Sequence, residues 1–230
     1  MVDYYPLVTF FVTLALALLL GRQFAQRHKR HQLVWTVSLG LLALAALIAF
    51  LGNHDIVGWS VAVYKAYLPL TAIPVGLIGL GVLLLFAKHP RWSQAYAAYW
   101  VITAALVLAV VAITPVKDPN ALGQSLAEQG PNVGGSFLPG FGSVSLLQTL
   151  PGAAVFIGGG VYSWWKDRTR KYGLILGAGG VLFTVAGATS RLGGSAVFFL
   201  LTTLAAIVTF IGFVLAVEFS AVRAASPAKA

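Results

Sequence analysis

Seven long apolar runs dominate the sequence and limit what the chain can fold into. They cover approximately residues 5–20, 33–51, 60–87, 95–116, 144–165, 172–189 and 196–219. A hydrocarbon core about 30 Å thick needs about 20 apolar residues for each helical crossing. Within lipid the backbone polar groups must bond inside each crossing segment, which favours helices over open strands. The runs therefore predict an all-α membrane protein, a bundle of seven transmembrane helices forming one polytopic domain over residues 1–230.

The charged residues predict how this bundle is oriented. Charged residues make up only 9% of the chain, against about 25% in soluble domains. Twelve of the 15 bases fall in alternate connections or after the last run: Arg22, Arg27, Lys29, Arg30, Lys88, Arg91, Lys166, Arg168, Arg170, Lys171, Arg223 and Lys229. By the positive-inside rule these connections are cytoplasmic, which puts the N-terminus outside and the C-terminus in the cytoplasm.

The same pattern explains the formal net charge of +9. Basic cytoplasmic connections are attracted to anionic lipid headgroups, so membrane lipids are the expected partner and nucleic acid is not. Small size and tight loops favour the cytoplasmic membrane of a prokaryote, crossed several times by the chain.

One connection, residues 117–142, is long and is expected on the outside. Its first half predicts a short helix, with Asp118 as the cap, Pro119 at the first helical position and Gly130 as the terminator. Its second half, GPNVGGSFLPGFG, is rich in glycine and proline. Two interpretations stay open: a cap over the external mouth of the bundle, or a solvated connection.

Stripes of small residues predict which faces of two helices pack inward, because lipid gives apolar helices no hydrophobic reason to associate. In the sixth run the stripe is Gly173, Gly177, Gly180, Thr184, Gly187 and Arg191. In the third run it is Lys65, Pro69, Ala72, Gly76 and Gly79. We expect these glycines to make helix contacts. The two external bases Lys65 and Arg191 are then expected on protein-facing sides.

These two bases define a hypothetical ligand site at the external mouth. Its residues are Trp59, Tyr64, Lys65, Tyr67 and Arg191, and its ligand would be an anionic amphiphile or a lipid. The alternative is structural: Lys65 extends to the outer interface beside an aromatic belt, paired with Asp55 or Asp3.

The sequence offers little for catalysis, metals or cofactors. It has no cysteine, and its four histidines, His28, His31, His54 and His89, fall in connections, so no pair of spans supplies axial haem ligands. No Asp or Glu lies at the centre of a span, where ion-coupled carriers place carboxylates. The seventh run contains no lysine for a retinal Schiff base. We expect no enzyme activity, metal or cofactor.

Three functional classes remain, and binding or sensing is preferred. The second is an accessory subunit of a larger membrane assembly, with other subunits or further copies of the chain as partners. The third is a carrier or channel in which Pro69, Pro74 and Pro151 kink moving helices. Thr202, Ala206 and Thr209 share one helical face and either line a small polar cavity or bond their own backbone at i−4.

Overall fold

The computed structural model describes residues 4–86, 89–120, 122, 137–191 and 195–225. Within these ranges it contains seven long helices and no strand. They are α1 (Tyr5–Arg27), α2 (Arg30–Asn53), α3 (Val61–Phe86), α4 (Pro90–Ile113), α6 (Phe141–Lys166), α7 (Lys171–Arg191) and α8 (Ser195–Ala225). Each has a segment long and apolar enough to cross a membrane. The prediction of an all-helical chain with seven long apolar helices is confirmed for the described residues.

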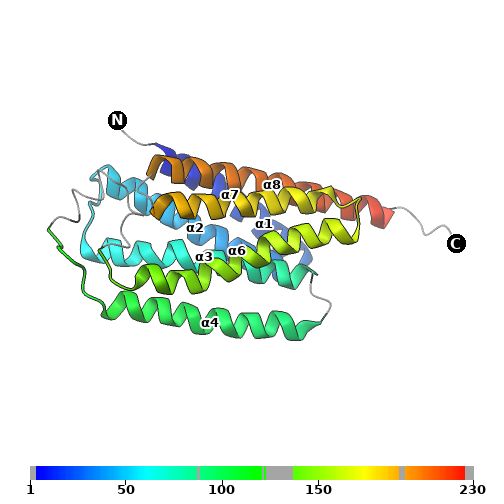
Figure 1. Cartoon of the computed structure of the whole chain (residues 1–230). Helices are drawn as coiled ribbons and strands as arrows, with labels where there is room; N and C mark the ends of the chain where they lie inside the picture. Colours follow the sequence, from blue (N-terminus) through cyan, green and yellow to red (C-terminus); the bar gives the residue numbers. More distant parts are fainter. Residues whose placement is uncertain (1–3, 87–88, 121, 123–136, 192–194, 226–230) are drawn as a thin grey trace.

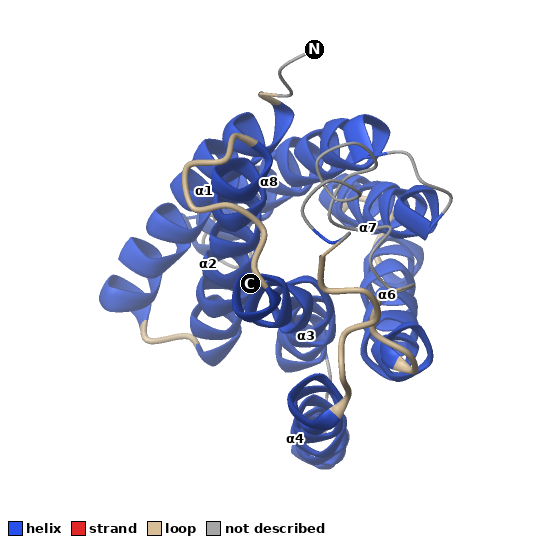
Figure 2. Cartoon of the chain, turned by 90° about the vertical axis from the view of Figure 1, so that its left-hand side faces the viewer, coloured by secondary structure: helices blue, strands red, loops and turns tan. Residues whose placement is uncertain are grey.

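Six of the helices form a closed ring. Each packs against the next in the order α1, α2, α3, α6, α7 and α8, and α8 returns to α1. Helix α4 lies outside this ring, against α3 and α6 (Figure 1; Figure 2). We call the end with the Lys166–Lys171 turn the base-rich end and the end where α1 starts at Tyr5 the base-poor end. The ring is closed by the contacts of α3 with α6 and of α8 with α1, which are not consecutive in the chain.

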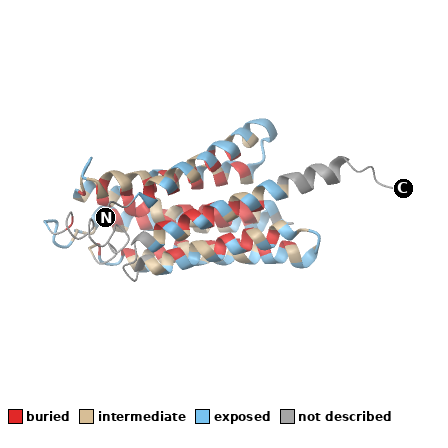
Figure 3. Ribbon diagram, turned by 90° about the horizontal axis from the view of Figure 1, so that it is seen from above, coloured by how far each residue is buried: buried red, intermediate tan, exposed pale blue. Residues whose placement is uncertain are grey.

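Burial follows the contacts between helices. Figure 3 shows buried residues along the faces where helices meet and exposed residues along the outer faces. On α4, for example, Val107 is 0% exposed whereas Ile113 is 80% exposed. Large apolar side chains on the outside are unfavourable in water and suit a surrounding of lipid.

Side chains of neighbouring helices hydrogen-bond to backbone carbonyls at, or one turn before, two of the helical prolines. Pro151 in α6 has no N–H to donate to the Leu147 carbonyl one turn earlier. The Tyr99 hydroxyl of α4 donates to that carbonyl instead. Ser38 of α2 donates to the Pro74 carbonyl in α3 at 2.7 Å. The proline-containing helices are therefore tied to their neighbours at the irregular positions.

Close backbone approach joins α6 to both of its ring neighbours. Near the base-rich end, a Cβ built at Gly173 would lie 2.6 Å from the Gly160 carbonyl oxygen. Between α3 and α6, a Cβ at Gly79 would lie 3.0 Å from the Gly152 Cα, and one at Gly76 would overlap the Gln148 and Trp100 side chains. Only residues without a Cβ permit these separations.

The other glycines of the predicted stripe differ in their surroundings. A Cβ at Gly180 would lie 2.9 Å from Ile157 and 3.0 Å from Phe156, which is a tight contact with α6. At Gly177 the nearest atom would be 3.6 Å away, an ordinary contact distance. At Gly187 a Cβ would meet no atom within 4 Å. The stripe therefore begins in close contact and ends beside open space.

The described parts of the long connection pack onto the base-poor end. Leu122 and Leu138 are 0% exposed and belong to one apolar cluster with Trp59, Tyr64 and Tyr67. The Lys117 N–H donates to the Phe137 carbonyl at 2.8 Å. Most of the short helix predicted over 118–130 falls outside the described residues, as do residues 131–136.

Candidate ligand-binding cavity

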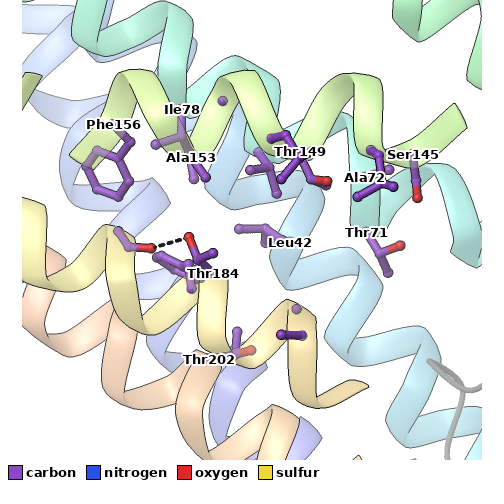
Figure 4. A pocket seen from close by; sticks show the side chains of 18 of the residues that line it. Leu42, Thr71, Ala72, Ile78, Ser145, Thr149, Ala153, Phe156, Thr184 and Thr202 are labelled. Atoms are coloured by element: carbon purple, nitrogen blue, oxygen red, sulfur yellow. Dashed lines mark hydrogen bonds between the residues drawn. The ribbon is translucent and has the colours of Figure 1, made fainter. Parts of the chain in front are cut away.

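A cavity of about 350 Å³ lies inside the helix ring. Its walls come from α2, α3, α6, α7 and α8. Apolar side chains supply most of the lining, and five residues add hydroxyl groups: Thr71, Ser145, Thr149, Thr184 and Thr202. No charged residue lines it within the part of the chain that the structure describes. Figure 4 shows these side chains facing one another across the space between α3, α6, α7 and α8.

The cavity extends from near the base-poor end to the middle of the bundle. Along α3 it extends from Leu68 to Ile78, a length of about 15 Å at the α-helical rise. Phe141, at the start of α6, borders it near the base-poor end, and Phe156 borders it at depth. Its size falls in the range of about 300–1,000 Å³ that is typical of small-molecule sites.

Three of the lining hydroxyls are already engaged with their own helices. Thr71 donates to the Leu68 carbonyl at 2.7 Å, Ser145 to the Gly142 carbonyl at 3.0 Å, and Thr184 to the Gly180 carbonyl at 2.8 Å. These local bonds satisfy the hydroxyl protons at little cost. The oxygen lone pairs remain on the cavity side as weak acceptors.

Thr202 of α8 differs from these three residues. It is 5% exposed, it lines the cavity, and its Oγ1 has no hydrogen-bond partner among the described residues. An unpaired buried hydroxyl costs about 1–3 kcal/mol. The hydroxyl of the next residue, Thr203, is bonded both to the Thr9 hydroxyl at 2.6 Å and to the Phe199 carbonyl at 2.9 Å. Thr202 is thus a cavity-lining residue whose buried hydroxyl lacks a hydrogen bond within the described chain.

A second, smaller space of about 40 Å³ adjoins the first. Both are lined by Leu42, Thr71, Phe198 and Thr202, so Thr202 stands at the junction. Tyr67 lines the smaller space. This volume accommodates a water molecule. Tyr67 is therefore the one described residue of the predicted mouth site that borders a space adjoining the cavity.

The other predicted aromatic residues lie in packed surroundings. Trp59 is 8% exposed and donates from Nε1 to the Asn53 side-chain oxygen at 3.1 Å. Its ring meets the Tyr67 ring edge to face at 5.6 Å between centroids. Tyr64 is 0% exposed and meets the Phe137 ring edge to face. These rings hold the base-poor end together by close aromatic packing.

The described structure places the side chain of only one of the two predicted cations, Lys65. Lys65 does not line either cavity; its Nζ donates to the Ala112 carbonyl of α4 at 3.1 Å. It therefore faces the helix outside the ring. Arg191 is the last residue of α7, and its side chain lies outside the described residues, so its place in one ligand site with Lys65 stays a prediction.

A buried polar contact between α6 and the outer helix α4 was not anticipated from the sequence. Gln148 of α6 is 1% exposed, and its Nε2 donates to the Trp100 carbonyl at 3.0 Å and to the Thr103 hydroxyl at 2.7 Å. A single glutamine within an apolar run was the available signal. It faces α4, one residue before Thr149, which lines the cavity. Helix α6 thus separates a polar helix contact from an apolar cavity.

Comparison with protein-family models, with curated proteins and with solved structures gives no match for this chain.

Proposed function

We propose that this membrane protein binds an uncharged, largely apolar small molecule in the cavity inside its helix ring. The carrying observation is the cavity of about 350 Å³, whose lining is largely apolar and includes Thr202, a residue whose buried hydroxyl has no partner within the described structure. Pockets of this kind combine apolar walls with a few polar groups that fix the orientation of a ligand. A hydroxyl or carbonyl group on the ligand would complete the hydrogen bonding of Thr202.

The lining argues for a neutral ligand body. An ionised group in an apolar cavity without an opposite charge carries a large desolvation cost. No described lining residue supplies such a charge. If the ligand is an anionic amphiphile, as the sequence suggests, its charge lies outside this cavity. Binding then serves sensing or storage in the cytoplasmic membrane, with the base-poor end outside.

Replacing Thr202 with Val tests the proposal. The change removes the unpaired hydroxyl and keeps the side-chain shape, so the folded protein should be as stable as wild type or more stable. Occupancy by a co-purifying neutral molecule should fall about fivefold, since one hydrogen bond contributes about 1 kcal/mol. Native mass spectrometry of protein released gently from membranes measures the occupancy.

Thr203→Val is the matched control on the adjacent residue. It breaks the bond to Thr9 between α1 and α8, so it should lower stability by about 0.6 kcal/mol and leave occupancy unchanged. A third variant, Ala153→Phe, fills the cavity and should abolish occupancy. Unchanged molecules at unchanged occupancy in Ala153→Phe would overturn the proposal. Purification with other chains and no small molecule would favour the accessory-subunit alternative.

A further inference from the structure

The wall between α6 and α7 borders both the cavity and the outside of the bundle. Leu150 of α6 lines the cavity although 58% of its surface is exposed. Thr184 and Ala188 of α7 also line the cavity and are exposed. These residues of two adjacent helices line the cavity and are also exposed on the outside of the bundle. They mark a lateral opening, which we call the α6–α7 opening.

The divergence of the two helices accounts for this opening. Near the base-rich end α6 and α7 touch through Gly160 and Gly173, with backbone atoms as close as a glycine pair allows. Figure 1 shows the two ribbons meeting beside their connecting turn and separating toward the other end. There, a Cβ at Gly142 or at Gly187 would meet no atom within 4 Å, and both glycines line the cavity.

The surface around the opening is apolar. The outward residues near it are Leu147, Val181 and Val185, which are 41%, 46% and 43% exposed. Val181 and Val185 flank Thr184 on α7, and Leu147 precedes Leu150 on α6 by nearly one turn. In a helix that crosses a membrane, such a surface contacts acyl chains. The opening therefore faces hydrocarbon.

The described residues at the base-poor end favour this lateral route over one from water. The cavity is bordered there by Leu68 and Phe141, which are 2% and 7% exposed. Both belong to the cluster that contains Trp59, Tyr64 and the fully buried Leu138. On the α3 side of the cavity, a packed aromatic layer thus stands between the cavity and the base-poor end.

We propose that the cavity takes up its occupant sideways from the bilayer through the α6–α7 opening, and that this occupant is an uncharged, membrane-soluble molecule. The identity of a physiological occupant rests on the proposed function, whereas the lateral route is a property of the fold. A molecule already dissolved in the hydrocarbon enters an apolar cavity without first being transferred to water. One hydroxyl or carbonyl on it then bonds to Thr202 on α8, the helix next to α7 in the ring.

Photolabelling in lipid vesicles tests the route directly. The probe is a small neutral aryl diazirine that partitions into the bilayer, and adducts are mapped by peptide mass spectrometry. We expect adducts on the cavity residues Ala153 and Phe156 as well as on the outer residues Leu147 and Val181. An ionised, water-soluble aryl diazirine should label Ala153 at least about tenfold less, because a charged group enters hydrocarbon at high cost.

Thr184→Trp tests whether the opening is the entrance. The indole should reduce adducts on Ala153 and Phe156 by about fivefold or more, since it fills a gap that threonine leaves open. Adducts on Leu147 and Val181 serve as an internal reference and should not change. Val185→Trp, which adds the same ring to the adjacent outward position, should leave all four yields within about twofold of wild type. If Thr184→Trp does not fold, Ala188→Trp takes its place.

The outcomes separate the route from the proposed function. Equal labelling of Ala153 by the ionised probe would overturn lateral entry and leave ligand binding intact. Adducts confined to outer residues would also overturn it, as would equal effects of Thr184→Trp and Val185→Trp. Loss of occupancy in Thr202→Val is measured with the opening unaltered, so it reports on the cavity alone.

Discussion

The two ends of the α6–α7 pair show opposite uses of glycine. At the base-rich end, a Cβ at Gly160 would lie 2.6 Å from the Gly173 carbonyl oxygen and 2.8 Å from the Gly177 nitrogen. At the base-poor end, a Cβ at Gly142 or Gly187 would meet no atom within 4 Å. The same pair of helices is therefore closed by backbone contact at one end and hollow at the other.

This difference shows that a glycine leaves space beside a helix, and that the separation of the two helix axes determines whether the neighbouring helix fills that space. Where two glycines face each other, the helices approach and dispersion contacts replace the missing side chains. Where the axes have separated, the missing side chains leave a cavity that neighbouring residues do not fill. The junction lies near Gly180, where the Phe156 and Ile157 side chains still contact α7.

Gly160→Ala should produce the largest effect on this comparison. The added methyl would meet backbone atoms of Gly173 and Gly177, which cannot rotate away as a flexible side chain can. The helices must separate, and overpacking of this kind costs about 1–3 kcal/mol. Denaturant titration of the protein in mixed micelles, followed by circular dichroism, measures the loss.

Gly187→Ala is the matched control at the hollow end. Its methyl would enter open space beside the cavity, and alanine is a better helix former than glycine. We expect stability equal to or slightly above that of wild type. A loss as large as that of Gly160→Ala would mean that the two ends are packed alike.

The architecture was predictable from the sequence because each crossing needs its own apolar run. Seven runs became seven helices in the described chain, since lipid leaves the backbone few alternatives. The predicted stripe in α7 contains Gly173 and Gly180, at which an added Cβ would lie within about 3 Å of α6 atoms. It did not separate them from Gly187, because periodicity reports a face of one helix and not the angle at which the next helix crosses it.

The cavity was harder to predict than the fold. The sequence indicated that Lys65 faces protein. Because α3 packs against α2, α4 and α6, several of its sides face protein, and the sequence did not show which of these helices Lys65 contacts. Lys65 contacts α4, whereas Gly79 meets α6. The shared face of Thr202 and Thr209 was visible as a pattern. Both hydroxyls are buried without a partner in the described structure, an outcome that helix propensity does not reveal.

Gln148→Leu should have the next largest effect, and it sharpens the contrast between the two faces of α6. The change removes two hydrogen bonds to α4, and hydrogen bonds between membrane helices contribute about 0.6–2 kcal/mol each. Thr103 keeps its bond to the Tyr99 carbonyl, so the loss should lie toward the lower limit. The same micelle titration measures it.

Thr149→Val provides the comparison on the cavity-facing side of the same helix. Because Thr149 borders empty space, the isosteric change should alter stability by less than about 0.5 kcal/mol. If Thr149→Val costs as much as Gln148→Leu, the cavity face of α6 is as tightly constrained as its α4 face, and the division between them fails.

Asp167→Asn probes the closed end with the smallest expected effect. In the turn between α6 and α7, the Asp167 carboxylate accepts hydrogen bonds from the Thr169 hydroxyl and N–H and from Arg170 at 3.1 Å. The Thr169 hydroxyl is the main cause that lowers the pKa of this carboxyl below its ordinary value of 3.8, and Arg170 adds to it.

A lowered folded-state pKa means that ionised Asp167 stabilises the folded protein above the ordinary carboxyl pKa. This contribution should be fully present above about pH 5 and should disappear as the pH falls through the lowered folded-state value. The melting temperature of wild type should therefore slightly exceed that of Asp167→Asn at neutral pH and converge with it in acid. Equal melting temperatures at every pH in this range would mean that the turn closing the base-rich end is held by its backbone and the glycine contacts alone.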